Sequence, residues 1–344
     1  ATPDELRLDG PLRLDGVPVR AAWRQPLGAD AEAGGWIDGT VTLSDAAIKA
    51  FDIPLPEGLV GGQGVGRFRL DLPRDGSPKL DLESDLVGME LSVGGIGWRK
   101  SASDAGGFEL SAVLGEVPEV EGFSLSAPGL ALDGQINLDD AGGFAGATFE
   151  SIRVGDWLDG QVELTPRGAD LSPAVRISEG RLDVRNLPDG SGEAGDGAPL
   201  DVTLDEVVVS DGIALTSVRG NFQNGRAGLS GTFTGRMNGR TPVEGTLAPA
   251  NGGTAVRVQS ADAGNVIKDA KLTPNAEGGT LDLVLTPVRN APSGTYNGQF
   301  LVENMRLRKA PILADLLDAI SVVGLIDQLA GPGILFSTVD GKFR

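Results

Sequence analysis

Along most of the chain, apolar and polar residues alternate with a period of two. The first residues read LRLDGPLRLDG, in which Leu6, Leu8, Leu12 and Leu14 alternate with charged residues. Successive side chains of a β-strand point to opposite faces, so the leucines share one face of a hairpin and the charges share the other. Similar units recur at 39–45, 66–72, 130–140, 279–285 and 298–304. With roughly 12 residues per strand and turn, the pattern predicts on the order of 15–25 strands.

The alternation also predicts how the strands are arranged. Strands that are buried on both faces of a parallel sheet read as continuous apolar runs, whereas these have one apolar and one wet face. The sequence therefore predicts a mainly β fold with a large, mostly antiparallel sheet whose one apolar face must be covered. Such a sheet can fold over as a sandwich, close as a barrel, or curl into a groove that something else fills. Within this pattern we expect a short helix at 46–53, a hairpin at 88–100 that turns at Gly94-Gly95, and a mobile acidic loop at 189–199.

Residues 310–336 depart from the alternation, because aliphatic residues crowd together there. Asp315, Asp318 and Asp327 interrupt them, and no uncharged stretch is long enough to span a membrane. Pro311 suits the first position of a helix, and the apolar spacing predicts a pair of short amphipathic helices at about 310–330. We expect their apolar stripe to act as a lid or plug over the sheet, and it consists of Ile312, Leu313, Leu316, Leu317, Ile320, Ile326 and Leu329.

Composition and charge exclude several classes of function. The net charge of −19 argues against nucleic acid as a partner, because phosphate binding requires an excess of Lys and Arg. The chain has no cysteine and no histidine, so disulfides, thiolate nucleophiles and the usual general base are missing. We therefore expect neither an enzyme nor a bound cofactor or metal.

Two further sequence features are interpreted as structural. Gly190, Gly192 and Gly195 match the spacing of a dinucleotide-binding loop but lack the strand and helix that such a loop requires, so we interpret them as part of the acidic loop. The tryptophans are dispersed, and we expect core or groove anchors at Trp23, Trp36, Trp98 and Trp157.

Two stretches near the C-terminus carry a resemblance to a known family. DAGNVIKDAKLTPNAEGGTLDLVL (262–285) contains an Asp-Ala-Gly turn before a short helix and then a Gly-Gly strand, and in 294–344 the segment APILADLL…GLIDQLAG runs into a strand. In this order the elements resemble the C-terminal region of AsmA-like proteins, especially the YhdP-type branch of Gram-negative envelope proteins. DLVGMELSVGGIGWRK (85–100) looks like a weaker family element. On this basis we divide the chain into a groove of hairpins at 1–260 and an AsmA-like segment at 261–344.

The resemblance implies a function. AsmA-like and TamB-like proteins are anchored in the inner membrane, extend through the periplasm as elongated, curled β-sheets with a hydrophobic groove, and are proposed bridges for phospholipids. The resemblance thus implies that the large, mostly antiparallel sheet of this chain is curled and that its apolar side forms an elongated hydrophobic groove. We therefore expect a periplasmic fragment that carries phospholipid acyl chains between the inner and outer membranes. The expected partners are the rest of the anchored full-length protein and other envelope proteins. The alternative is a closed β-sandwich scaffold or partner-binding module of the envelope. Our candidate groove-lining residues are Leu281, Leu283, Leu285, Phe300 and Val302.

Overall fold

The computed structural model describes residues 4–27, 34–56, 58–168, 171–188, 195–292, 294–308 and 333–344. Strands make up 66% of the structure, and two short α-helices accompany them, which confirms the mainly β prediction. The contacts divide the chain into two compact units, Ala1–Pro173 (unit 1) and Ala174–Arg344 (unit 2). Each unit is described by itself below.

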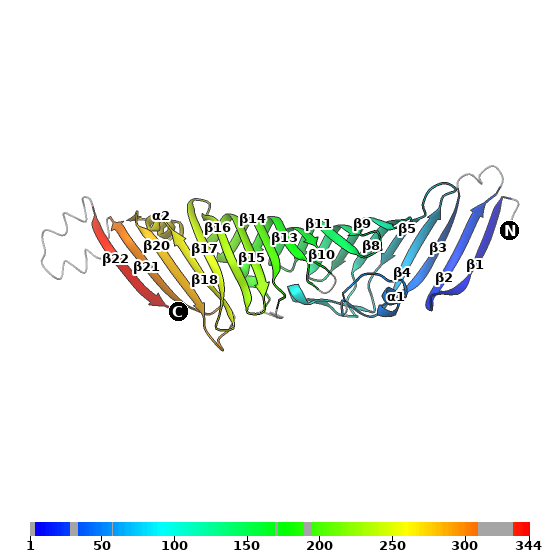
Figure 1. Ribbon diagram of the computed structural model, residues 1–344, viewed down its shortest axis with the longest axis horizontal. Helices are drawn as coiled ribbons and strands as arrows, with labels where there is room; N and C mark the ends of the chain where they lie inside the picture. The colour runs from blue at the N-terminus through cyan, green and yellow to red at the C-terminus, as the bar shows by residue number, and fades with distance from the viewer. Residues whose placement is uncertain are drawn as a thin grey trace. The chain divides into compact units, whose positions relative to one another are not determined.

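Unit 1 contains an open antiparallel sheet in which most strands pair with their neighbours in sequence (Figure 1). The order across the sheet is β1-β2-β3-β4-β5-β8-β9-β10-β11-β12. The strands are Glu5–Leu14 (β1), Val17–Pro26 (β2), Gly35–Ser44 (β3), Val60–Leu72 (β4), Lys79–Ser84 (β5), Gly107–Leu114 (β8), Pro118–Ala127 (β9), Leu130–Leu138 (β10), Phe144–Val154 (β11) and Leu158–Thr165 (β12).

Two short elements are inserted into this sheet. Helix α1 (Asp45–Ala50) begins where the Ser44 hydroxyl accepts a hydrogen bond from the Ala47 amide, as an N-cap residue should. The hairpin of β6 (Met89–Val93) and β7 (Trp98–Lys100) turns through the 3-10 segment η2 (Gly94–Ile96) and pairs with the start of β4. The hairpin expected at 88–100 is confirmed, and the helix expected at 46–53 is present but shorter, since it ends at Ala50.

The strands of unit 2 pair in the order β13-β14-β15-β16-β17-β18-β20-β21-β22, in which β13 and β14 are parallel and the other pairs are antiparallel. The two-residue strand β19 pairs with β21, and helix α2 (Ala263–Asp269) precedes it. The strands are Ala174–Asp183 (β13), Ala198–Ser210 (β14), Ile213–Gly225 (β15), Gly228–Met237 (β16), Thr241–Ala250 (β17), Gly253–Ser260 (β18), Ala276–Glu277 (β19), Thr280–Pro287 (β20), Tyr296–Leu307 (β21) and Ile334–Phe343 (β22).

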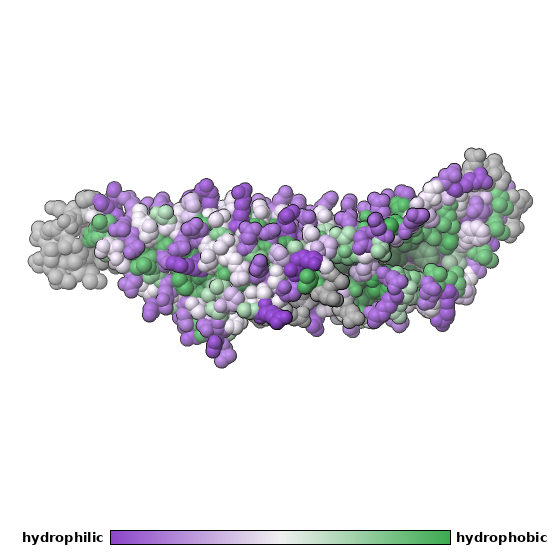
Figure 2. All heavy atoms as spheres, in the orientation of Figure 1, coloured by the Kyte–Doolittle hydropathy of each residue, from purple (hydrophilic) through white to green (hydrophobic). Residues whose placement is uncertain are grey.

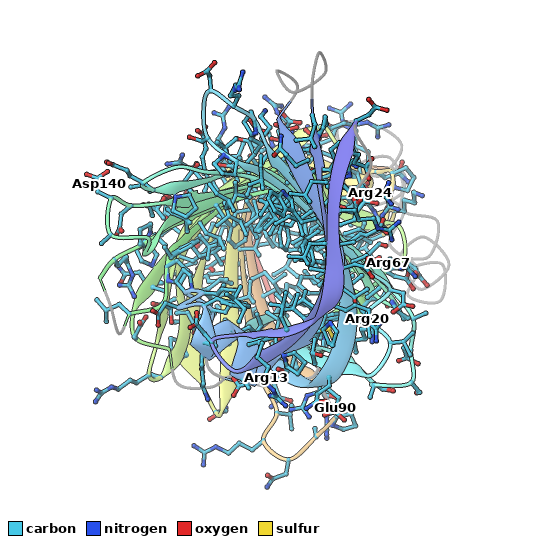
Figure 3. The ribbon with its side chains drawn as sticks, turned by 90° about the vertical axis from the view of Figure 1, so that its right-hand side faces the viewer. Arg13, Arg20, Arg24, Arg67, Glu90 and Asp140 are labelled. Carbon is cyan, nitrogen blue, oxygen red and sulfur yellow. The ribbon has the colours of Figure 1, made fainter. Side chains whose placement is uncertain are left out.

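The strand register places apolar residues opposite one another throughout each sheet. In unit 1, for example, Trp23 pairs with Leu8 on one side and with Ile37 on the other, and Ile37 pairs with Leu70. Side chains directly opposite in neighbouring strands lie on the same face, so each sheet has one continuous apolar face. Figure 3 shows the strands of unit 1 curving around this face, with Arg20 and Arg24 on the outer side. The predicted one-sided, curled sheet is confirmed.

The core of each unit lies along one set of strand ends, which we call the covered rim. In unit 1 this rim includes the turn at 15–16, α1, the β6–β7 hairpin and the turns at 128–129 and 155–157. In unit 2 it includes α2 and the turns at 211–212 and 238–240. The buried apolar side chains near the two covered rims include Val17, Leu86, Met89, Leu91, Trp98, Leu130 and Val154 in unit 1 and Leu204, Leu215, Val243 and Val266 in unit 2. The opposite strand ends, which we call the open rim, contain mostly half-buried apolar residues.

Three sequence predictions are corrected or qualified by these observations. The acidic loop expected at 189–199 ends before residue 198, because β14 begins at Ala198. Residues 189–194 of this predicted loop lie outside the described residues. Trp36 is not a core or groove anchor: it lies on the outer face, where its Nε1 donates to Asp38 Oδ2 (3.0 Å) and the Arg69 guanidinium stacks on its ring. Strands β18 and β20 pair directly on either side of residue 260, so the sheet of unit 2 continues across the predicted division, which itself stays a prediction.

Candidate functional site

The candidate site is the apolar, concave face of each sheet, which we call the trough of that unit. In unit 1 the trough is most open at β1, where Leu8 is 67% exposed although it lies opposite Trp23 on the apolar face. Leu12 and Leu14 are also exposed, whereas Val19 and Val17, their partners on β2, are buried. Figure 2 shows hydrophobic side chains gathered in a hollow in this part of unit 1. Because soluble proteins usually cover such surfaces, we take this open aliphatic wall as the candidate binding face.

Phenylalanine rings make the trough walls smooth in both units. The ring of Phe68 occupies the space above Gly39 on the neighbouring strand, where an added Cβ would lie 2.7 Å from it. Phe233 covers Gly245 and Phe300 covers Gly341 in the same way. Glycine in these positions lets each ring lie along the wall instead of projecting from it, as in the pairing of aromatic residues with strand glycines. The trough therefore keeps room beside a wall that is rich in apolar carbon.

The five predicted groove-lining residues come together in unit 2. Leu281 pairs with Val302 and Leu283 pairs with Phe300, so these four residues lie on one face of two neighbouring strands. Leu285 follows on the same face of β20, towards the open rim. Val302 is buried and the other four are half-buried, and Leu281 packs against the core beneath α2. The structure thus places all five on the trough wall; whether they contact a lipid stays a prediction.

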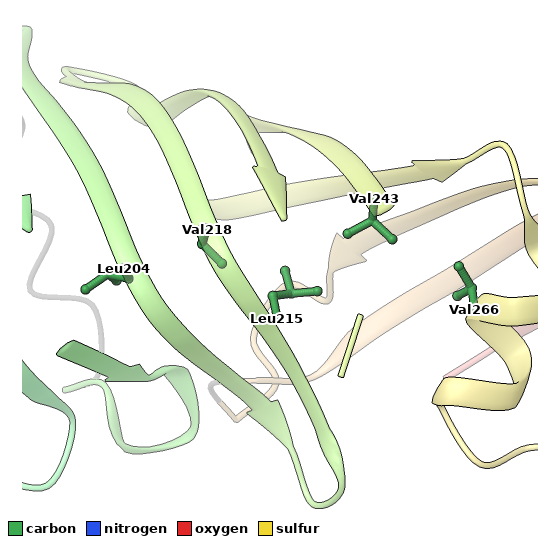
Figure 4. Close-up of a cluster of buried hydrophobic side chains, with 5 residues drawn as sticks. All are labelled: Leu204, Leu215, Val218, Val243 and Val266. Atoms are coloured by element: carbon green, nitrogen blue, oxygen red, sulfur yellow. The ribbon is translucent and has the colours of Figure 1, made fainter. Parts of the chain in front are cut away.

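Helix α2 covers part of the trough in unit 2. Its Val266 packs into a cluster of buried side chains that also contains Leu204, Leu215, Val218 and Val243 (Figure 4). The sequence signals for α2 are Asp262 as an N-cap and the turn that follows it, but sequence reasoning placed the lid further along the chain. That predicted lid lies outside the described residues and stays a prediction; its positions are Ile312, Leu313, Leu316, Leu317, Ile320, Ile326 and Leu329.

Polar contacts fix α2 at both of its ends. At the N-terminal end, the Ala263 and Gly264 amides donate to the carbonyls of Gly279 and Gly278. At the C-terminal end, the buried Asp269 carboxylate accepts hydrogen bonds from the Thr241 hydroxyl (2.7 Å) and from Arg240 (3.2 Å). These contacts make α2 a fixed cover rather than a loosely attached one.

A charged cluster supports the covered rim of unit 2 where β13 ends. Asp183 is 1% exposed, and its carboxylate accepts hydrogen bonds from Arg185 (2.6 and 2.8 Å) and from Arg181 (3.1 Å). The hydrogen bonds from the Arg185 side chain hold the pKa of Asp183 well below its usual range, although burial acts in the opposite direction. Since every partner of this carboxylate comes from the same segment or its neighbours, we interpret the cluster as a structural anchor.

The described walls of the troughs consist mainly of apolar side chains. Across the described ranges, no three or more acidic side chains are grouped so that they could hold a metal ion. In the same part of the chain, no helix has the length and hydrophobicity needed to cross a membrane. Comparison with models of known protein families, with curated proteins and with solved structures finds no match for this chain.

Proposed function

We propose that the chain is a periplasmic part of a bridge-like lipid-transfer protein, and that its troughs hold phospholipid acyl chains. The observation that carries this proposal is the continuous apolar face of each unit, which is covered along one rim and only half-buried along the other. A lipid fits this arrangement, since its tails can enter the trough while its headgroup remains in water at the open rim.

The energetics of the trough suit a ligand that moves. Each methylene removed from water contributes about 0.8 kcal/mol, so a short stretch of wall retains an acyl chain. Aliphatic contacts are not directional, and the Phe–Gly pairs leave few projections along the wall. A chain held in this way gains similar free energy at successive positions, which permits sliding along the strands' common face.

A closed scaffold is the alternative function. It requires a sheet that buries its own apolar side, either against a second sheet or by closure. In each unit the described strands instead follow one another in a single open sheet, and Leu8, Leu12 and Leu14 remain exposed. Lipid binding therefore accounts for the exposed apolar face better than the scaffold does.

Native mass spectrometry of the purified chain, followed by organic extraction, tests the proposal. We expect co-purifying phospholipid that is lost in the double variant Leu8→Asp/Leu283→Asp, which places a charge in each trough. Leu301→Asp is the matched control, because Leu301 is exposed on β21 and faces away from the trough, opposite Asp282. Circular dichroism verifies that all three proteins are folded. The proposal is contradicted if the double variant retains as much lipid as the parent. It is also contradicted if the parent neither co-purifies with lipid nor extracts it from vesicles.

A further inference from the structure

The open rim of unit 2 has a distinctive set of charges. It consists of the loop at 195–197, the turns at 226–227 and 251–252, residues 288–292 and 294–295 between β20 and β21, and the last residues of β22. Arg226, Arg289 and Lys342 lie on it, and Asp196 lies in the loop beside β14. An accumulation of cations along one edge is unexpected in a chain with a net charge of −19.

These three cations are exposed, and their side chains have no ion-pair or hydrogen-bond partner among the described residues. Two cations elsewhere in unit 2 are paired, since Arg257 binds Asp282 and Arg308 binds Glu277. Among the described residues, no carboxylate pairs with these three cations, so this part of the open rim presents positive charge.

Aromatic residues lie between these charges and the trough. Tyr296 is half-buried on the apolar face, opposite Pro287, at the point where β20 and β21 meet the turn that contains Arg289. Phe343 lies on the same face, half exposed, with its ring against Gly298 beside Lys342. From Leu285 through Tyr296 to Arg289, the surface thus changes from aliphatic to amphipathic to cationic. The same order of groups surrounds a lipid at the boundary between hydrocarbon and water.

We propose that the open rim of unit 2 binds the phosphate of a lipid headgroup, and that unit 2 therefore selects phosphate-bearing lipids. This inference rests on the proposed function, because the trough must hold the tails of the same molecule. Guanidinium groups form charge-assisted hydrogen bonds with phosphate, and at an exposed site such contacts are individually weak.

The spacing of the cations supports contact with a moving headgroup. Four strand spacings separate the turn that contains Arg226 from the turn that contains Arg289, which corresponds to about 19 Å. One phosphate cannot contact both arginines at this separation. It can pass from one to the other while its tails slide along the wall between them.

The test compares phosphatidic acid with diacylglycerol of the same acyl chains, which lacks the phosphate. We expect Arg226→Glu/Arg289→Glu to weaken phosphatidic acid binding by about three- to tenfold, and to leave diacylglycerol binding unchanged. The matched control is Arg20→Glu/Arg219→Glu, which changes the net charge equally at two exposed, unpaired arginines on the outer faces. The difference between the variants should shrink at high salt, because exposed charges are screened.

The outcomes separate this inference from the proposed function. If the parent protein binds neither lipid, the proposed function is wrong, whatever the rim does. If the parent binds both lipids, and the rim variant loses no more affinity for phosphatidic acid than the control variant does, the proposed function stands and the headgroup site is wrong. If glycerol phosphate without acyl chains binds as tightly as phosphatidic acid, the rim is a site for free phosphate and not for a lipid headgroup.

Discussion

The two units cover the same kind of sheet in different ways. In unit 1 the covered rim is built by α1 and the β6–β7 hairpin, and Trp98 of this hairpin donates a hydrogen bond to the Pro128 carbonyl (2.9 Å). In unit 2 a helix of seven residues takes this place, with Val266 among the buried side chains of β14, β15 and β17. Leucines of the alternating pattern differ widely in exposure: Leu8, on the edge strand β1 of unit 1, is 67% exposed, whereas Leu204, beneath the cover of unit 2, is 2% exposed.

This difference shows which part of the sequence decides how a trough is filled. The alternating strands produce a one-sided sheet in both units, so they do not distinguish an open trough from a filled one. The segments inserted between strands make that distinction, since they determine where aliphatic residues find partners. We therefore infer that the strands form the apolar wall, and that the inserted segments determine how much of this wall is accessible to a ligand.

The largest expected effect comes from removing one leucine side chain in each setting. Leu204→Ala leaves a cavity beneath the cover of unit 2 and should lower the free energy of unfolding by about 2–5 kcal/mol. Leu8→Ala removes the same atoms from an exposed position on β1 and should change it by no more than about 0.5 kcal/mol. Urea unfolding followed by circular dichroism, with hydrogen exchange of β1 and β14 peptides, measures both effects. Equal losses in the two variants would show that the trough of unit 1 is filled after all.

Much of the wall could be predicted from the sequence, because period-two alternation is a local property. Leu281, Leu283 and Leu285 were expected on one face, and the register with β21 places them there. The hairpin at 88–100 was equally predictable from its paired glycines. The position of Trp36 was not predictable in this way, because its indole lies on the outer face, where it contacts Asp38 and Arg69. Such partners are chosen by side-chain contacts that the alternation does not specify.

The covers were harder to predict than the wall. Helix α2 is short, and its role depends on contacts with β14, β15 and β17 that are distant in sequence. The basic open rim of unit 2 could not be predicted either. Arg226 and Arg289 are far apart in the sequence, and only the order of the strands brings them to the same edge of the sheet. The apolar spacing at about 310–330 predicted a lid in another part of the chain, which lies outside the described residues, and that lid remains a prediction.

An intermediate effect is expected at a buried lysine that holds the cover of unit 1. Lys100 is 2% exposed, and its Nζ donates to the carbonyls of Leu86 (2.7 Å), Met89 (3.0 Å) and Ser101 (3.0 Å). Lys100→Met preserves the length of the side chain but removes all three bonds, which should cost about 1–3 kcal/mol of stability. The natural reporter is tryptophan fluorescence, because all four tryptophans lie in unit 1.

Lys79→Met is the matched control for Lys100→Met. Lys79 forms an exposed ion pair with Glu121 (3.7 Å) in the same unit, and removing it should change stability by no more than about 1 kcal/mol. If the two variants unfold at the same urea concentration, the hairpin does not depend on Lys100, and the cover of unit 1 is held by its apolar contacts alone.

The smallest expected effect at accessible pH is an acid sensitivity specific to unit 2. Arg185 keeps the pKa of Asp183 below that of an unfolded aspartate, about 3.9, so the ionised carboxylate stabilises the folded unit above that pH. This contribution is lost progressively as the pH falls below about 5 towards the folded-state pKa. In unit 1, Lys100 is held by carbonyl oxygens, which do not titrate.

Hydrogen exchange of β13 and β14 peptides between pH 6 and pH 3, corrected for the intrinsic rate, should therefore show protection lost in the parent. In Asp183→Asn, protection should already be lower at pH 6 and depend less on pH. An equally steep pH dependence in this variant would assign the acid sensitivity to other carboxylates and remove this contrast between the two covers.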